Sequence, residues 1–174
     1  MKLARTLSAR TLSMVIALGL SVSGQSEHVS MPSLAVSGEV TKPLKLGAAD
    51  IAKMPHRSVQ AKAHDGSTHT YEGINLIDIL SQAGVQFGEQ LKGPKLAMFL
   101  LVDGADGYHA VFALPELDPA FTDKIVILAD KVDGRPLSSS EGPLRIAVPD
   151  EKRQARWVRQ VTGLTIVQAK GSSK

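Results

Sequence analysis

The stretch GPLRIAVPDEKRQARWVRQV, residues 142–161, combines a pattern typical of β-strands with a concentration of positive charge. An apolar run at 144–148 leads through Pro149 into a charged loop, and a second apolar segment begins at Trp157. The stretch holds five of the twenty Lys and Arg residues of the chain: Arg145, Lys152, Arg153, Arg156 and Arg159. We therefore expect two late strands joined by a basic loop. That loop binds an anionic ligand, binds a nucleic acid or faces water.

The first 24 residues have the pattern of a secretory signal peptide. Lys2, Arg5 and Arg10 precede a short apolar core at 14–20, and small residues follow at 22–24. The core is much shorter than the roughly 20 residues that a membrane-spanning helix needs, so we expect cleavage and no membrane span afterwards. No two Arg residues are adjacent in this segment. The pattern therefore favours general secretory export to a periplasmic or secreted location.

Removal of residues 1–24 changes the charge of the chain. The whole sequence has 20 Lys and Arg, 17 Asp and Glu, and a formal net charge of +3. The segment 1–24 carries three of the basic residues and none of the acidic ones, so the remainder is formally neutral. Nucleic-acid-binding proteins need a broad basic field, and we therefore expect no nucleic-acid partner. The local charge at 142–161 favours a small anionic ligand instead.

The chain contains no cysteine. This excludes disulfides, thiolate metal ligands, Cys nucleophiles and redox dithiols from the chain itself. The sequence also has no Walker loop, no Gly-x-Gly-x-x-Gly and no Gly-x-Ser-x-Gly motif. Phosphate loops, dinucleotide fingerprints and serine hydrolysis therefore have no support.

The remaining pattern predicts one domain at 33–168, with a flexible leader at 25–32 and a polar tail at 169–174. Apolar alternation and buried runs predict about eight strands, at 34–40, 57–64, 67–73, 95–103, 108–114, 124–132, 143–149 and 157–167. Two short helices are expected within 46–55 and 74–85, and residues 115–121 form a turn or a third. Asn75 is a candidate cap of the second helix, and Gly84 a candidate end. The fold class is α+β, with β-rich mixed or antiparallel sheets.

Three phrases, in their order, carry a resemblance to a known family. YEGINLIDILSQAGV (71–85) has an aromatic-x-Gly before a Leu-rich helix, and DGADGYHAVFALPEL (103–117) opens a strand with Asp-Gly-Tyr. DGRPLSSSEGPLRIAVPDEKRQARWVRQVTGLTIV (133–167) contains Gly-x-Pro-Leu, Gly-Pro-Leu-Arg and a basic loop before Trp-Val. Together they resemble the oxidoreductase molybdopterin-binding domain, the sulfite oxidase-like fold, over about residues 34–167.

The resemblance implies a compact, β-rich α+β domain that holds a molybdenum–pterin cofactor. Carried over to this chain, it places four residues at the cofactor pocket: Arg145, Lys152, Arg153 and Trp157. It also places the segment with Tyr108 and His109 beside the substrate pocket, which makes these two the candidates for catalytic residues. Turn chemistry is the expected role of Asp103 and Asp106 in the same segment.

Two features depart from the resembled family. Its members bind molybdenum through a Cys thiolate, and the equivalent position falls at Ala61, Ala63 or His64, none of which is Cys. Family members that leave the cytoplasm do so folded, with a twin-arginine signal, whereas the general secretory route passes unfolded chains. Both departures argue against a molybdenum enzyme of the usual kind.

We therefore expect an exported molybdopterin-binding-domain-like protein that binds a pterin-type or other anionic cofactor in periplasmic redox chemistry. The alternative is a non-catalytic periplasmic module that keeps the fold without molybdenum and binds a small anion or a periplasmic protein partner. Enzymatic activity stays open between the two. A third possibility is a metal site made of His64, His69 and His109, because a hairpin would bring the first two together.

Overall fold

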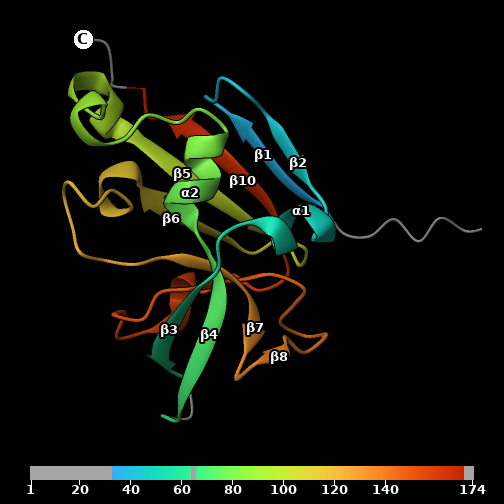
Figure 1. Ribbon diagram of the computed structural model, residues 1–174. Coiled ribbons are helices and arrows are strands. Elements are labelled where there is room, and N and C mark those ends of the chain that lie inside the picture. The colour runs from blue at the N-terminus through green and yellow to red at the C-terminus, as the bar shows by residue number, and fades with distance from the viewer. Residues whose placement is uncertain (1–32, 64–65, 171–174) are drawn as a thin grey trace, which may run out of the picture.

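The strands of the protein form two sheets, seen in the computed structural model that describes residues 33–63 and 66–170 (Figure 1). Sheet A has the strand order β2-β1-β10-β5-β6, and sheet B has the order β3-β4-β7-β8 with β9 also paired to β7. β1 and β10 are parallel and every other described pair is antiparallel. The predicted class, a β-rich α+β fold with mixed sheets, is confirmed.

The elements have the following bounds. Sheet A consists of β1 Leu34–Gly38, β2 Leu44–Leu46, β5 Met98–Gly104, β6 His109–Ala113 and β10 Val161–Gln168. Sheet B consists of β3 Arg57–Lys62, β4 Thr68–Asn75, β7 Ile127–Val132, β8 Arg135–Pro136 and β9 Arg145–Ala147. The α-helices are α1 Ala48–Lys53 and α2 Leu76–Gln82, and the short 3₁₀ helices are η1 Gly88–Gln90, η2 Gly93–Ala97, η3 Leu114–Glu116 and η4 Gln154–Arg156.

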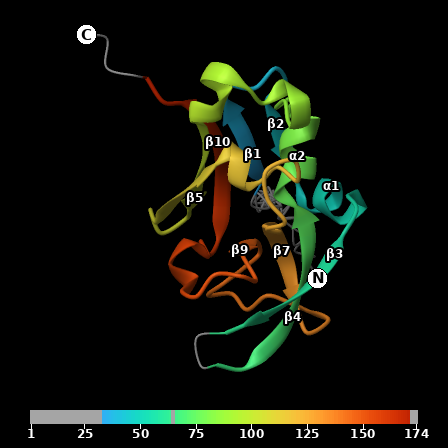
Figure 2. The same cartoon turned by 90° about the vertical axis from the view of Figure 1, so that its left-hand side faces the viewer.

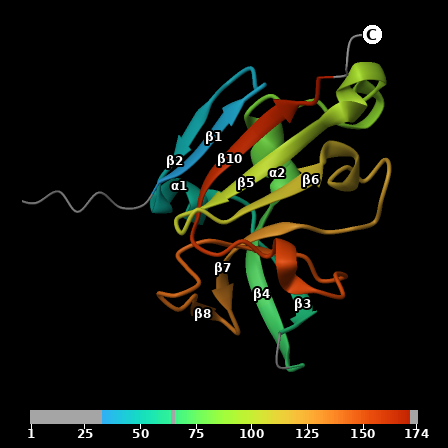
Figure 3. The same ribbon diagram turned by 180° about the vertical axis from the view of Figure 1, so that it is seen from behind.

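Sheet A buries one face under α2. Alternate residues of its strands are fully buried, including Leu100 and Val102 of β5 and Phe112 of β6. Helix α2 contributes Leu76, Ile79 and Leu80 to the same core. Figure 1 shows α2 in front of the sheet, and Figure 3, from behind, shows the other face with no helix over it.

Strand β4 leads the chain from sheet B to sheet A. It pairs with β3 in sheet B and continues directly into α2, which packs on sheet A. Gly73 lies at a register shift between β4 and β7, and a Cβ atom there would clash with the backbone of Leu128. Helix α2 begins after Asn75, whose side chain makes no capping hydrogen bond, and ends before Gly84, which has φ +84°. The predicted end of the helix is therefore confirmed, and the predicted side-chain cap is not formed.

The described chain has ten strands where the sequence predicted about eight. The two additional strands, β2 and β8, have three and two residues, which is too short for an alternating pattern to develop. The predicted strand at 157–167 begins only at Val161, and the segment before it contains η4. Asp133 and Gly134, both with positive φ, form the two-residue turn between β7 and β8.

Within the described residues, no helix is long and apolar enough to cross a membrane. The predicted signal peptide at 1–24, the leader at 25–32 and most of the polar tail lie outside the described residues. These assignments stay predictions.

Candidate functional site

A cavity of about 1030 Å³ lies where the basic segment 149–157 approaches both sheets. Figure 2 shows this segment between the β5–β6 end of sheet A and the β3–β4 hairpin of sheet B. Five residues singled out from the sequence line the cavity together: Arg145, Lys152, Arg153, Trp157 and Tyr108. The structure therefore brings these five residues to one place.

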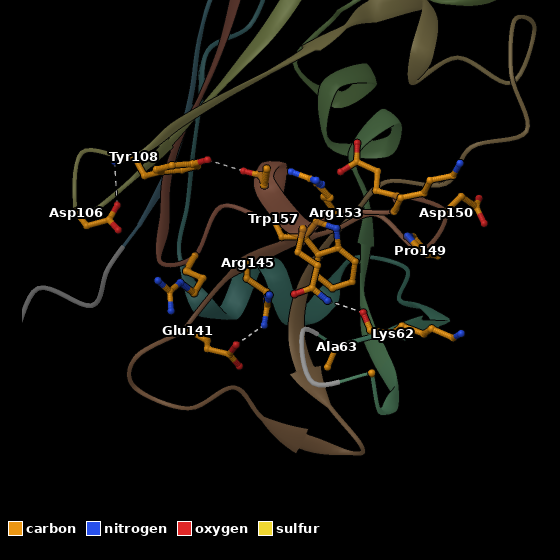
Figure 4. Close-up of a pocket in the computed structure, with 16 residues that line it drawn as sticks. Lys62, Ala63, Asp106, Tyr108, Glu141, Arg145, Pro149, Asp150, Arg153 and Trp157 are labelled. Atoms are coloured by element: carbon orange, nitrogen blue, oxygen red, sulfur yellow. Dashed lines mark hydrogen bonds and ion pairs between the residues drawn. The ribbon is translucent and has the colours of Figure 1, made fainter.

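Arg145 is the buried cation of the cavity. It begins β9, which pairs with the central strand β7, and its side chain is only 6% exposed. Its guanidinium carbon lies 5.4 Å from the ring centroid of Tyr71 and 5.3 Å from that of Trp157. Nη1 of Arg145 donates to a carboxylate oxygen of Glu141, and Figure 4 shows this pair beside the Trp157 ring.

Two buried N–H groups of the cavity lining have no acceptor within the described part of the chain. They are Nε of Arg145 and Nε1 of Trp157. A buried donor without an acceptor costs about 1–3 kcal/mol, and native structures rarely leave one unsatisfied. Both residues line the cavity, but these two nitrogen atoms are enclosed within its wall, so a bound molecule would meet other atoms of the guanidinium and the indole ring first.

The basic segment is fixed by three consecutive residues, each bound to a different element. Gln154 donates from Nε2 to the carbonyl of Lys62 in the β3–β4 hairpin. The carbonyl of Ala155 accepts from the hydroxyl of Tyr108, at 2.6 Å, beside the β5–β6 turn. Arg156 contacts Glu116 of η3 at 3.0 Å. The loop that carries Lys152 and Arg153 is thus held from three sides.

Arg156 has a structural role that the sequence did not predict. The basic loop is predicted to bind an anion or a nucleic acid or to face water, but Arg156 lies in η4 and does not line the cavity. Its guanidinium binds Glu116 through both Nη atoms and Glu151 through Nε, at 2.7 Å. Burial lowers the pKa of the Arg156 guanidinium. The hydrogen bonds that Arg156 donates to Glu116 and Glu151 have the larger combined effect, so the pKa is raised above its usual value.

The cavity has an excess of uncompensated positive charge. Lys62, Lys152, Arg153 and Arg159 all line it, and none forms an ion pair with a carboxylate of a described residue. Four carboxylates also line it, but three of them already accept hydrogen bonds. Those of Glu141 and Glu151 bind arginines, and that of Asp106 accepts from the backbone N–H of Tyr108. The lining thus has five cations and four carboxylates, and Glu151 also pairs with Arg156 outside the lining, so the remaining excess of positive charge favours an anionic occupant.

The three positions considered for a thiolate ligand have different places in the structure. Ala63 lines the cavity, at the end of the β3–β4 hairpin. Ala61 is 3% exposed and packs in the hydrophobic core. His64 lies outside the described residues. Of the two described positions, only Ala63 lines the cavity, and its side chain is a methyl group that cannot bind a metal.

The alternative three-histidine metal site does not assemble within the described residues. His69 contacts Asp133 at 2.6 Å in sheet B, whereas His109 contacts Asp103 at 2.8 Å in sheet A. No group of three or more His, Asp or Glu residues in the described part of the chain lies close enough to hold a metal ion. His109 does not line the cavity, because its side chain points from β6 toward Asp103. Of the two neighbouring candidates, only Tyr108 lines the cavity.

The family of the chain follows from its similarity to known proteins. The chain matches the family described as oxidoreductase molybdopterin binding domain over residues 25–174. The protein belongs to this family. Among solved structures, this molybdopterin-binding-type domain is similar to the sulfane dehydrogenase SoxCD from Paracoccus pantotrophus, with a TM-score of 0.63 and 21% sequence identity. The similarity covers 79% of this chain and 38% of the SoxCD chain, and it shows the fold. No curated protein matches the chain significantly in sequence.

The residues of this oxidoreductase molybdopterin-binding domain fit one part of the cofactor that the family name implies. Its anionic part would be held by Arg145, Trp157 and the cations of the cavity that pair with no carboxylate of a described residue. A thiolate–metal bond has no donor there, because the chain has no cysteine and Ala63, which lines the cavity, carries only a methyl group. We therefore derive no step that runs through a protein-bound metal.

Several residues of the site could not be recognised from the sequence pattern. Glu141 neutralises Arg145, Tyr71 flanks it from β4, and Gln154 fixes the basic segment. Glu141 lies only four residues before Arg145, and that spacing of opposite charges was the one available hint. Tyr71 lies 74 residues from Arg145 along the chain, and the sheet B pairing brings the two together.

Proposed function

We propose that this protein binds the anionic part of a pterin-type cofactor, or another small anion, in its cavity and serves periplasmic redox chemistry. The observation that carries the proposal is the convergence on one cavity of the buried Arg145 and four cations that pair with no carboxylate of a described residue. A buried guanidinium offers a rigid donor edge that matches carboxylate and phosphate oxygens. The neighbouring unpaired cations, Lys152 and Arg153, extend this preference to the rim.

The size of the cavity supports a small molecule rather than a polymer. Ligand sites of proteins are typically about 300–1,000 Å³, and this cavity of about 1030 Å³ lies at the upper end. The aromatic rings of Tyr108 and Trp157 add apolar surface at its wall. A molecule with a planar ring and an anionic group matches this combination.

Export is part of the same proposal. The segment 1–24 has the charge and apolar pattern of a secretory signal, and the match to the family begins at residue 25. Cleavage after this segment would release a formally neutral domain into the periplasm. Trypsin digestion and mass spectrometry of the protein from a periplasmic extract would give its first residue.

The position of Ala63 favours a second candidate, a non-catalytic module that keeps the fold and the anion site without molybdenum. In this case the bound anion, or a periplasmic protein partner, is the functional output. Metal and pterin analysis of the protein purified natively from the periplasm separates the two candidates. Stoichiometric molybdenum with pterin supports the redox role, whereas a metal-free anion supports the binding module.

A thermal-shift screen tests the binding proposal itself. We expect inorganic phosphate, pyrophosphate or a phosphorylated pterin to stabilise the protein, by about 2.7 kcal/mol when the ligand is present at a hundred times its Kd. Arg145→Ala should remove this effect, and Arg57→Ala is the matched control, because Arg57 is exposed on β3 and does not line the cavity. Equal stabilisation of both variants would contradict a site at Arg145.

A further inference from the structure

One of the carboxylates that line the cavity, that of Glu141, contacts the buried guanidinium of Arg145. The carboxylate of Glu141 accepts from Nη1 of Arg145, and both residues line the cavity. Arg145 is 6% exposed in its side chain, whereas the Glu141 side chain is 31% exposed. The cation is therefore fixed inside the wall, and the carboxylate reaches it from the open side.

The backbone around Glu141 is held in place. Its carbonyl accepts from the backbone N–H of Gln160 at 2.9 Å, and its N–H donates to the carbonyl of Ser138 at 3.0 Å. Gln160 also donates from Nε2 to the carbonyl of Ser139 at 2.8 Å. These bonds fix the main chain and leave the side chain of Glu141 as the part that can change position.

We propose that Glu141 competes with the ligand for Arg145 and so determines which anions the cavity accepts; this rests on the proposed function of the cavity as an anion site. A buried arginine needs a counter-charge, and in the free protein Glu141 supplies it. An oxyanion that enters the cavity either replaces this carboxylate or is repelled by it. In both cases the negative charge of Glu141 opposes anion binding.

The competition selects a chemical class. A tethered carboxylate acts at an effective concentration in the millimolar range or above, so a free monocarboxylate gains little by exchanging with it. A dianionic oxyanion has more charge for Arg145, and it has further partners in the unpaired Lys152 and Arg153 at the rim. The cavity is therefore specific for phosphate-type dianions over simple carboxylates.

The test is titration of the mature protein and three variants with inorganic phosphate and with acetate, followed by calorimetry and thermal shift. Glu141→Gln keeps an acceptor for Arg145 and removes the charge. We expect its Kd for phosphate to fall roughly tenfold or more, and acetate, without effect on the wild type, to stabilise it. Asp123→Asn is the matched control, because it also removes one carboxylate charge, and Asp123 is exposed and does not line the cavity. We expect less than a threefold change for it.

The third variant, Glu141→Gln with Arg145→Met, removes the ion pair as a unit, and we expect it to bind neither anion. If Glu141→Gln is unfolded without anions, phosphate should restore its folding, and failure to do so counts against the proposal. Phosphate binding to the wild type with an unchanged or weaker Kd in Glu141→Gln would overturn the competition but leave the anion site. Absence of binding in every protein would overturn the site itself.

Discussion

Arg145 and Trp157 form a stacked pair at the wall of the cavity, with the guanidinium carbon 5.3 Å from the centroid of the indole ring. Both residues are buried, and each has an N–H group without an acceptor in the described chain. The pair combines an aromatic surface with two donors. Because Arg145 is buried against this ring, the basic stretch contributes to one local site instead of a broad basic surface.

Two alanines, two residues apart, distinguish the cavity from the core. We expect Ala63→Leu to block the cavity and to weaken phosphate binding at least tenfold, with little change in stability, because the added atoms enter open space. Ala61→Leu should instead destabilise the protein by about 1–3 kcal/mol, because Ala61 is packed in the core. Urea unfolding together with phosphate titration measures both effects. The reverse pattern would place the binding site elsewhere.

Arg156 should contribute to stability more than to binding. In Arg156→Lys we expect the free energy of unfolding to fall by about 2 kcal/mol, because an ammonium cannot reproduce the bidentate contact with Glu116 and the bond to Glu151. Urea unfolding gives the change, and Arg57→Lys on the exposed part of β3 is the control. An equal loss in both variants would indicate no special role for Arg156.

The hydroxyl of Tyr108 should order the basic segment. Tyr108→Phe removes the 2.6 Å bond to the carbonyl of Ala155 while keeping the ring. We expect a loss of about 1 kcal/mol in stability and faster hydrogen exchange at the amide of Trp157, which donates to Gln154 in the same segment. Phe121→Leu, a change at an exposed aromatic outside the cavity lining, is the control. Unchanged exchange at Trp157 would show that the other tethers suffice.

The turn between β7 and β8 should lose stability in acid. The backbone N–H of Thr70 and the ring of His69 both bind the carboxylate of Asp133, and they hold its pKa below the usual value of 3.8. A carboxyl with a lowered pKa in the folded state stabilises the protein above its unfolded pKa, and this contribution is lost as the pH falls through the folded pKa.

Asp133→Asn isolates this contribution, because asparagine also tolerates the positive φ of the turn. We expect wild type and Asp133→Asn to differ in stability at neutral pH, with the difference shrinking below a pH of about 4. Urea unfolding at a series of pH values measures it. A difference that stays constant into strong acid would assign the effect to the turn geometry alone.

The sequence predicted the class of the fold because most strands carry buried runs or alternation, as in β5 and β10, where every second residue faces the core. It missed β2 and β8, because two or three residues carry no period. It also extended the last strand back to Trp157. Trp157 and Val158 are apolar because they pack at the cavity wall and in the core, and not because they belong to a strand.

The site was predicted in part. The basic stretch pointed to Arg145, Lys152 and Arg153, and the structure places them at one cavity. Local charge does not distinguish the five basic residues of the stretch, and only the resemblance singled out three of them, whereas Arg156 turns away to bind Glu116. Such a division depends on which carboxylates the folded chain brings near, and that information is absent from local charge. The resemblance placed Tyr108 and His109 together beside the substrate pocket, but only Tyr108 lines the cavity, whereas His109 begins β6 and contacts Asp103.

The most direct test of an anion held by Arg145 without a protein–metal bond is native mass spectrometry of the protein purified from the periplasm. We expect the wild type to carry a bound organic anion and Arg145→Lys to have lost it, with neither requiring a metal for retention. Detection of only the empty chain in both proteins would contradict the anion site. A metal-dependent ligand that survives in Arg145→Lys would contradict the role of Arg145.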